Sequence, residues 1–421
     1  MKAAALALLV AAATTAAAGE GGDVAPRSFF RDGDKVVLVG NAFAERLSLH
    51  GRFEAQVRSR LPDARLAFRN FGWSGDTPKL MPRPLNFGDL HTHLERERAT
   101  AVLLFFGMNE SFEGEKGLAQ FVADLDALVT EIAARRYDGE APPRIALVSP
   151  IPHEDTRRSG LPDGAAHNRA LEAYARAMEE LAERRSIFFA DLFSPLRTTT
   201  SSSPRGPDLT INGIHLGDYG DWVAASVLAD AFLVPPSSAS LVVDVERQWA
   251  VGAGASVVDA EFSDAAVTVA IEMSGLPAAP PPPGAEPGDA LLDDMPRVLV
   301  LGLPPGRYEI AIDGLACATA SAEELSRGFF LTGGPLFDGI ERLRAAIVEK
   351  DRQFFYRHRA VNGEYVYGRR KEPFGVVNFP GEMKALDEIV SRADAEIARL
   401  ARASSTFDVT IRPSPPPGDA R

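Results

Sequence analysis

The sequence has a single cysteine and no concentration of positive charge. Cys317 is the only cysteine in 421 residues, so no disulfide can form within the chain. The 45 lysines and arginines are outnumbered by 58 aspartates and glutamates, and no segment gathers the basic side chains. Because binding to nucleic-acid phosphates requires clustered Lys and Arg, we expect no nucleic-acid partner.

Several recognised motifs are also absent. The chain has no Gly-rich phosphate loop, no dinucleotide fingerprint and no Cys–His metal pattern. His91 and His93 are close in sequence, but no third ligand stands at a zinc-binding spacing. We therefore interpret them as part of an exposed polar segment, and we expect no metal and no cofactor.

The first residues have the pattern of an export signal. Met1-Lys2 precedes an alanine-rich apolar run over residues 3–18, and small residues precede Gly19. We expect a signal peptide over residues 1–18 and a secreted or periplasmic protein. The run is short and rich in alanine, so it does not predict a membrane anchor.

Residues 28–236 alternate strand-like and helix-like patterns. The predicted strands cover residues 36–39, 66–71, 101–106, 145–148 and 187–192. Amphipathic helical patterns separate them, which predicts an α/β fold with a parallel sheet between helices. Gly, Asn and Ser clusters follow the strands, at the edge where open α/β sheets bind their ligands.

The remainder of the chain has a different pattern. Strand-like segments without helical crossovers predict a small antiparallel β unit over residues 237–322. Its proline-rich loop, residues 276–288, is expected to be exposed. Helices return over residues 323–405, and we interpret the charged, aromatic part after Phe354 as docking onto the α/β domain. Residues 406–421 are expected to form a disordered tail.

Four short segments follow predicted strands or precede the last helix of the α/β region. They are Gly-Asn-Ala-Phe from Gly40, Asn-Phe-Gly-Trp-Ser-Gly-Asp from Asn70, Gly-Met-Asn-Glu from Gly107 and Asn-Gly-Ile-His from Asn212. Their order and spacing resemble the SGNH hydrolase family, which includes the GDSL esterases. The resemblance covers about half of the chain. It implies the three-layer, flavodoxin-like α/β/α fold of that family and the hydrolysis of small-molecule or carbohydrate esters.

In that family a serine attacks the ester carbonyl, a histidine takes its proton and a carboxylate orients the histidine. The resemblance makes His215 the base of this site. It makes Gly72 and Asn109 donors to the negative oxygen of the intermediate, a role worth about 3–4 kcal/mol for each donor.

The segments also depart from the family pattern. Ala42 occupies the position of the nucleophilic serine, and Asn212 occupies that of the aspartate. Asn41 and Glu110 replace two further aspartates of the pattern. An ordinary Ser–His–Asp mechanism is therefore excluded, because an alanine methyl group cannot attack a carbonyl.

Three accounts of this site remain open. In the first, the nucleophile is Ser74 or a water activated by His215, with help from carboxylates among Asp76, Glu110, Glu154 and Asp155. In the second, the site binds an acyl or sugar ligand without cleaving it. In the third, the fold is an envelope scaffold.

His153 and Glu154 follow the fourth predicted strand and are candidates for substrate contact. For Ser74, a turn role is the better interpretation than a nucleophile, and for His153 a backbone-bonded role is at least as good an interpretation as substrate contact.

Overall fold

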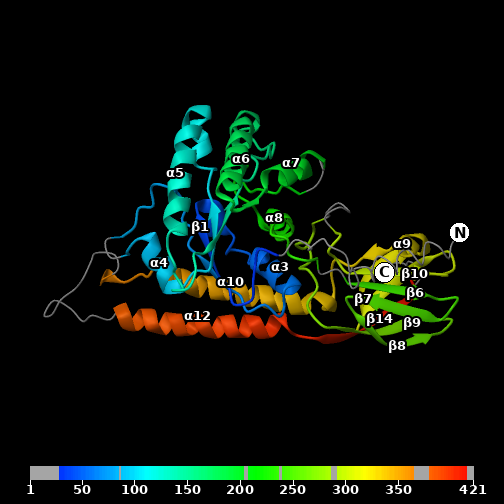
Figure 1. The fold of residues 1–421 in the computed structure, drawn as a ribbon. Coiled ribbons are helices and arrows are strands. Elements are labelled where there is room, and N and C mark those ends of the chain that lie inside the picture. The colour runs from blue at the N-terminus through cyan, green and yellow to red at the C-terminus, as the bar shows by residue number, and fades with distance from the viewer. Residues whose placement is uncertain are drawn as a thin grey trace, which may run out of the picture.

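The computed structural model describes residues 28–84, 87–202, 207–236, 239–285, 292–364 and 379–414. The expected signal peptide, residues 1–18, lies outside these residues. Within the described ranges, no helix combines the length and the apolar character needed to cross a membrane. The chain forms an α/β domain, a β domain at one end, and a pair of long helices that run along the α/β domain (Figure 1).

Five parallel strands form the centre of the α/β domain, in the order β2-β1-β3-β4-β5. They are β1 (Lys35–Gly40), β2 (Ala67–Asn70), β3 (Ala101–Phe105), β4 (Arg144–Val148) and β5 (Phe188–Ala190). Their apolar runs fit this arrangement, because strands covered by helices on both faces have no polar face. The predicted α/β fold class is confirmed.

Helices cover both faces of this sheet. One face carries α3 (Arg52–Arg60), α7 (Phe193–Ser202) and α8 (Asp218–Ala231), and the other carries α4 (Leu90–Glu97), α5 (Glu115–Ala133) and α6 (Ala165–Arg185). Alternate residues of β1 point to the two faces of the sheet. Val36 and Leu38 belong to the hydrophobic core on the side of α3, α7 and α8, and Val37 and Val39 belong to the core on the side of α4, α5 and α6. The three layers predicted from the family resemblance are therefore present.

The β domain contains two sheets, with the orders β13-β10-β6-β7 and β12-β11-β14-β9-β8. The strands are β6 (Ser240–Asp244), β7 (Trp249–Ala253), β8 (Ser256–Phe262), β9 (Val267–Met273), β10 (Arg297–Leu301), β11 (Arg307–Ile312), β12 (Leu315–Ser321), β13 (Phe329–Phe330) and β14 (Ser405–Pro413). A short helix, α9 (Ala322–Arg327), follows β12.

Three expectations about this region are wrong. The unit is not purely antiparallel, because β6 and β10 pair in parallel. Residues 406–413 are not a disordered tail, because β14 pairs with both β9 and β11 and buries Val409 and Ile411. The described part of the proline-rich loop is not exposed throughout: Ala279 is buried, and its carbonyl accepts a hydrogen bond from the Trp222 indole of α8 at 2.8 Å.

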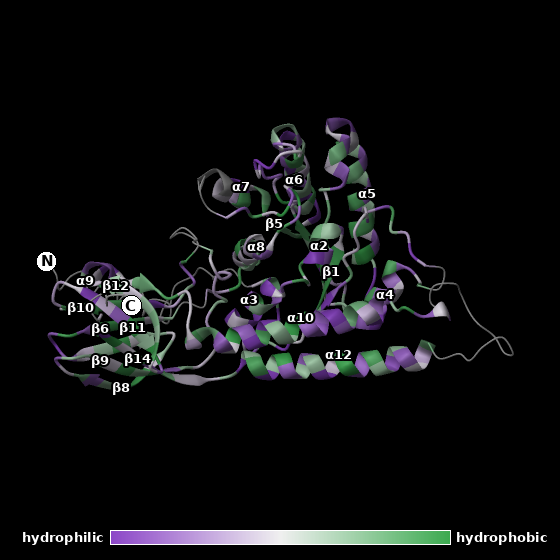
Figure 2. Cartoon of the chain, turned by 180° about the vertical axis from the view of Figure 1, so that it is seen from behind, coloured by the Kyte–Doolittle hydropathy of each residue, from purple (hydrophilic) through white to green (hydrophobic). Residues whose placement is uncertain are grey.

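Two long helices, α10 (Asp338–His358) and α12 (Phe379–Ala401), lie between β13 and β14 in the sequence. They pack on each other, and α10 also packs on α3 and β2. Hydrophobic and hydrophilic residues alternate along both helices (Figure 2). The docking predicted for the segment after Phe354 is confirmed for its described part, because Arg357 and Arg359 form ion pairs with Glu97 and Glu45 of the α/β domain.

A fully buried lysine joins α10 to the α/β domain. Lys350 Nζ lies 2.5 Å from Glu54, 2.8 Å from Asp351 and 3.3 Å from the Phe68 carbonyl. The ammonium has three hydrogens, so each acceptor can receive one. The ion pair with Glu54 therefore ties α10 to α3, and the hydrogen bond to the Phe68 carbonyl ties it to β2, the strand that leads into the second family-like segment.

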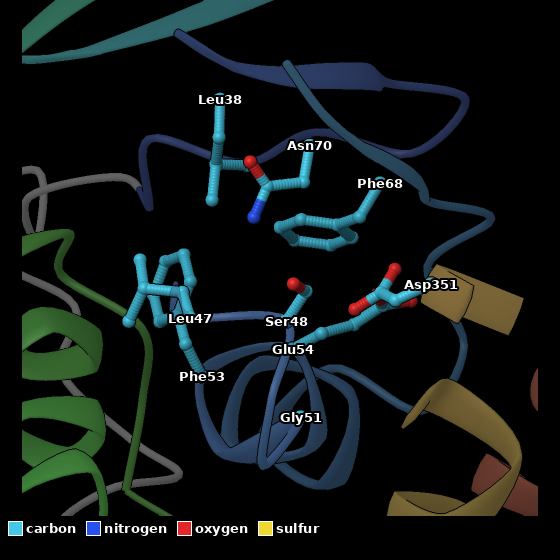
Figure 3. A pocket seen from close by; sticks show the side chains of 9 residues that line it. All are labelled: Leu38, Leu47, Ser48, Gly51, Phe53, Glu54, Phe68, Asn70 and Asp351. Carbon is cyan, nitrogen blue, oxygen red and sulfur yellow. The ribbon is translucent and has the colours of Figure 1, made fainter. Parts of the chain in front are cut away.

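A small cavity lies beside this lysine, with a volume of about 20 Å³. Figure 3 shows the side chains of Ser48, Glu54, Asn70 and Asp351 around it, together with apolar side chains. Substrate pockets are typically at least about 300 Å³. This cavity is therefore too small for a substrate.

Candidate active site

The four family-like segments meet at the carboxyl edge of the parallel sheet. Hydrogen bonds join neighbouring segments: Trp73 N–H to the Gly40 carbonyl at 2.8 Å, Asn109 Nδ2 to the Asp76 carbonyl at 3.2 Å, and Arg46 to the Leu216 carbonyl at 3.3 Å. The last bond places the loop that carries His215 beside the short helix α2 (Ala42–Arg46). The fold thus brings together residues that lie up to 170 positions apart.

Ala42 is the first residue of α2. The preceding Asn41 caps this helix, since its side-chain Oδ1 accepts a hydrogen bond from Phe43 N–H at 3.2 Å. Asn41 is also almost completely buried. Its described contact is therefore that of a helix cap. The Ala42 N–H makes no hydrogen bond in the described residues.

The backbone N–H of Gly72, which was expected to donate to an oxyanion, forms a hydrogen bond within the chain. Its N–H donates to Asn70 Oδ1 at 2.8 Å. A Cβ atom on Gly72 would come within 2.3 Å of Glu45 N, so the residue is needed for close packing against α2. The Gly72 N–H is thus bonded within the chain, and its role as a donor to an oxyanion stays a prediction.

Gly75 is a second candidate for that donor. Its φ of +91° favours glycine, and no heavy atom lies within 4 Å of a Cβ placed on it. Its N–H makes no hydrogen bond in the described residues, and it directly precedes Asp76, whose carbonyl accepts from Asn109. Two glycines stand in this segment, and the sequence alone offers no backbone angle with which to choose between them.

His215 and Asn212 are in contact, as the spacing predicts. Both side-chain amide atoms of Asn212 lie within 3.1 Å of His215 Nδ1, and Oδ1 also accepts from the His215 backbone N–H. Burial and the charge of Arg46 lower the pKa of His215 below 6.5. The imidazole is therefore neutral at neutral pH, and with the hydrogen on Nδ1 its Nε2 is a proton acceptor.

Ser74 has a different partner from the one a nucleophile needs. Its Oγ and N–H both donate to the Glu45 carboxylate, the N–H at 2.7 Å, and no described contact joins it to a histidine. Burial raises the pKa of Glu45, but the hydrogen bonds from Ser74 and the charge of Arg359 outweigh it and lower the pKa. An acidic carboxylate of this kind is a weak base for a serine hydroxyl.

Arg359, at the end of α10, reaches into this edge of the site. It forms an ion pair with Glu45 at 2.9 Å and lies 3.9 Å from the centre of the Trp73 ring. Arg83, which is paired with Asp76, also lies against the Trp73 ring, with its guanidinium carbon 4.3 Å from the ring centre. Sequence reasoning missed Arg359, Arg83 and Glu45, because nothing local indicates that segments so far apart in the chain form one network.

Asp76 is buried within that network. Its carboxylate is bonded to Arg83 on both oxygens. Burial raises the pKa of Asp76, and the neighbouring Arg83 opposes this effect only in part. The backbone carbonyl of Asp76 therefore accepts from Asn109 and its side chain accepts from Arg83, so both groups are bonded within the chain.

His153 and Glu154 support the loop that carries His215. The Glu154 carboxylate accepts the N–H groups of Leu209 and Thr210 at 2.9 and 2.6 Å, and the Glu154 N–H donates to the Gly213 carbonyl at 2.8 Å. His153 is buried against Gly213, where a Cβ would lie 2.8 Å from Nε2. Their described contacts are structural, in contrast to the expectation that they contact substrate.

His91 and His93 are not part of an exposed segment, as was expected; both are buried. His91 contacts the Tyr137 hydroxyl at 2.7 Å, and His93 contacts the Phe87 carbonyl at 2.8 Å. In the described ranges, no three His, Cys, Asp or Glu side chains gather as a metal site would require.

Glu110 is a buried carboxyl group beside Asn109. It accepts the Gly107 N–H at 2.8 Å, while its other oxygen has no hydrogen-bond partner among the residues that the structure describes. Burial raises its pKa to about 7, and the hydrogen bond only moderates that effect. Since the folded state resists ionisation of this group, stability is lost as the pH rises from the ordinary pKa of 4.5 through 7.

We expect Glu110→Gln to stabilise the protein in a pH-dependent manner. The uncharged amide keeps an oxygen for Gly107 N–H and removes the cost of ionisation. The free energy of unfolding should rise by about 2–3 kcal/mol at about pH 8 and remain close to the wild-type value at about pH 4. Urea denaturation of the wild type and the variant at each pH value measures the two free energies of unfolding. An equal change at the two pH values would contradict the claim that ionisation of Glu110 destabilises the protein.

Comparison with known proteins identifies this part of the chain. Residues 38–223 match the model of the GDSL-like Lipase/Acylhydrolase family. The chain therefore contains a GDSL-like lipase/acylhydrolase domain, which extends from β1 into α8. No curated protein sequence matches the chain.

Several solved structures are similar to this chain. A gut microbial diltiazem-metabolizing enzyme is 16% identical, with a TM-score of 0.68 over 93% of this chain and 99% of its own. An acetylxylan esterase from Geobacillus stearothermophilus is 18% identical, with a TM-score of 0.34 over 48% of this chain and 94% of its own. An aryl esterase from M. smegmatis is 14% identical, with a TM-score of 0.34 over 47% and 97%. The first similarity extends the shared fold to the β domain and the C-terminal helices.

Proposed function

We propose that this domain hydrolyses small-molecule or carbohydrate esters with water as the nucleophile and His215 as the general base. The observation that carries the proposal is the His215–Asn212 contact, which holds Nδ1 and leaves Nε2 without a partner in the described residues. The imidazole is neutral at neutral pH, as a base must be. The pattern of residues 1–18 supports the further proposal that the protein acts outside the cytoplasm.

The alanine has a direct consequence for the reaction. A serine at position 42 would place its hydroxyl beside the base, and Ala42 leaves that volume to a water molecule. The water oxygen attacks the ester carbonyl carbon while His215 Nε2 takes its proton. The negative oxygen is held by the N–H groups of Ala42 and Gly75 and by the Asn109 amide.

The intermediate then collapses in a single further step. The bond between the carbonyl carbon and the alcohol oxygen breaks, and that oxygen takes the proton from the His215 imidazolium. Acid and alcohol are released, and no acyl group is ever attached to the protein. Because Asn212 lacks the charge of an aspartate, it stabilises the imidazolium poorly, and the reaction is expected to be slow.

The test is hydrolysis of 4-nitrophenyl acetate and of acetylated oligosaccharides by the wild type and by His215→Ala. Loss of a general base is expected to reduce the rate by about 100-fold or more. Ser74→Ala is the matched control and should keep the wild-type rate within a few fold, because Ser74 is bonded to Glu45 and has no base. Equal rates for the wild type and His215→Ala would contradict the proposal.

The second candidate is a protein that binds such ligands without turnover. Ala42 and Asn212 favour it, because both replace residues that the serine mechanism requires. It predicts that the folded wild type is inactive and that calorimetry detects binding of an acetylated oligosaccharide. His215→Ala should leave that affinity largely unchanged.

A further inference from the structure

The short helix α2 carries an arginine beside the candidate site. Ala42 and Arg46 are four residues apart in this helix, so their side chains lie on the same face, with Cβ atoms about 5–6 Å apart. The Arg46 guanidinium reaches the loop of His215, because Nη2 donates to the Leu216 carbonyl at 3.3 Å. Ala42, Arg46 and His215 are each partly exposed. A positive charge therefore lies where α2 meets the loop of the proposed base.

This guanidinium can bind a further group. Its Nε is buried without a hydrogen-bond partner, and no ligand can reach that atom. Nη1 makes no hydrogen bond among the described residues and is not one of the buried nitrogens, so it has accessible surface and can donate to a ligand. Within the part of the chain that the structure describes, Arg46 forms no ion pair, and its sequence neighbour Glu45 is paired with Arg359 instead.

The carboxyl groups at the start of α8 do not neutralise this charge. Asp218 is paired with Arg52 at 2.6 Å. Burial raises the pKa of Asp221 to about 7, and the charges of Arg46 and Arg52 oppose this effect only in part. The carboxyl group of Asp221 is therefore only partly ionised at neutral pH. A single guanidinium without a full counter-charge matches the one negative charge of a carboxylate.

The proposed reaction places the alcohol portion of the ester on this side of the site. The alcohol oxygen leaves with the proton from His215 Nε2, so it lies beside the imidazole. Leu216 follows His215 directly, and its carbonyl holds the Arg46 guanidinium. A negative charge on the alcohol portion is therefore the one that comes within reach of Arg46 Nη1.

We propose that the site binds an ester whose alcohol portion carries a carboxylate, and that Arg46 Nη1 donates a hydrogen bond to this carboxylate. An acetylated hydroxy acid, such as an acetylated sugar acid, is a member of this class. The inference rests on the proposed function, because it names the substrate class of the same site. Arg46 then sets specificity, since a hydrogen bond to a charged group is stronger than one to a neutral group.

The experiment compares 3-acetoxybenzoate with 3-acetoxybenzamide, which has a similar shape but no charge. For release of acetate by the wild type, kcat/KM should be at least about tenfold higher for the benzoate, the value of one charge-assisted hydrogen bond. Raising the ionic strength should reduce this preference, because salt screens a partly exposed charge. In 3-acetamidobenzoate and 3-acetamidobenzamide, an N–H group replaces the ester oxygen. Calorimetry should show the same preference in the binding of these two stable compounds.

Two variants locate the preference at Arg46. Arg46→Gln removes the charge but keeps an amide donor for the Leu216 carbonyl, so the ratio of the two kcat/KM values should fall to about one. Arg158→Gln is the matched control. Arg158 also donates to a carbonyl of this loop, that of Ile211 at 2.9 Å, but its charge is paired with Asp208. This variant should keep the preference for the benzoate.

The outcomes separate this inference from the proposed hydrolase activity. Hydrolysis of the two acetates by the wild type with equal kcat/KM, or a preference that persists in Arg46→Gln, would overturn the inference and leave the hydrolase standing. Hydrolysis of neither acetate would overturn the hydrolase, and equal affinities for the two acetamido compounds would then overturn the role of Arg46 as well. Where Arg46→Gln does not fold, a wild-type preference that does not fall as salt is added would contradict the inference.

Discussion

The double variant Ala42→Ser/Asn212→Asp is expected to hydrolyse 4-nitrophenyl acetate at least about 100-fold faster than the wild type. The new serine begins α2, where the Arg46–Leu216 bond holds the His215 loop alongside. Aspartate at position 212 keeps the acceptor for the His215 backbone N–H, now 3.1 Å from Oδ1, and adds the charge that stabilises an imidazolium. The two substitutions together complete a serine triad.

This variant also changes the chemistry in a way that can be seen directly. It should show a burst of nitrophenol and be labelled by a fluorophosphonate, with the label located on residue 42 by mass spectrometry. Ala42→Ser alone should react far more slowly, since Asn212 leaves the imidazolium unstabilised. Adding His215→Ala should abolish the labelling. A folded double variant that is neither labelled nor faster would show that this sheet edge lacks the geometry of an esterase site.

Lys350→Met is expected to lower the free energy of unfolding by about 3–5 kcal/mol. The methionine has a similar length and apolar stem but no charge. Its introduction leaves Asp351 buried without the ammonium that lies 2.8 Å from it, and leaves Glu54 with Arg58 as its remaining cation. An uncompensated buried charge is more costly than the ion pair itself is stabilising.

The matched control for this variant is Arg352→Met, two residues further along the same helix. Arg352 pairs with Glu349 at 2.7 Å, but both side chains are more than half exposed. Exposed pairs contribute about 0–1 kcal/mol, so Arg352→Met should have little effect. Guanidinium denaturation of the three proteins gives the comparison. Similar losses in both variants would contradict the role assigned to the Lys350 ion pair.

Local patterns in the sequence predict the α/β domain well. Most strands of the parallel sheet are short apolar runs, and helical patterns separate consecutive strands in the sequence. The same logic fails for β14, where Val409 and Ile411 alternate with polar residues near a proline-rich terminus. This strand is stable because it pairs with β9 and β11, and strands so distant in sequence leave no local signal of their pairing.

The candidate site could be predicted only in part, for a related reason. The types and order of Ala42, Asn109, Asn212 and His215 are visible in the sequence, and the structure brings their segments together. The choice between Gly72 and Gly75 depends on which amide is bonded within the chain, and that is a property of the folded backbone. The ion pair between Arg359 and Glu45 forms only because α10 packs on the α/β domain, and no sequence motif indicates this packing.

The most direct test of the central claim is the pH dependence of kcat/KM for 4-nitrophenyl acetate, with the rate of His215→Ala subtracted. The account predicts a His215-dependent rate that is level around neutral pH and falls only below pH 6.5, because the lowered pKa keeps the base neutral to lower pH. Repeating the profile with Glu110→Gln removes the titration of the neighbouring carboxyl near 7 from the result. Superimposable profiles for the wild type and His215→Ala would contradict the claim that this histidine activates water.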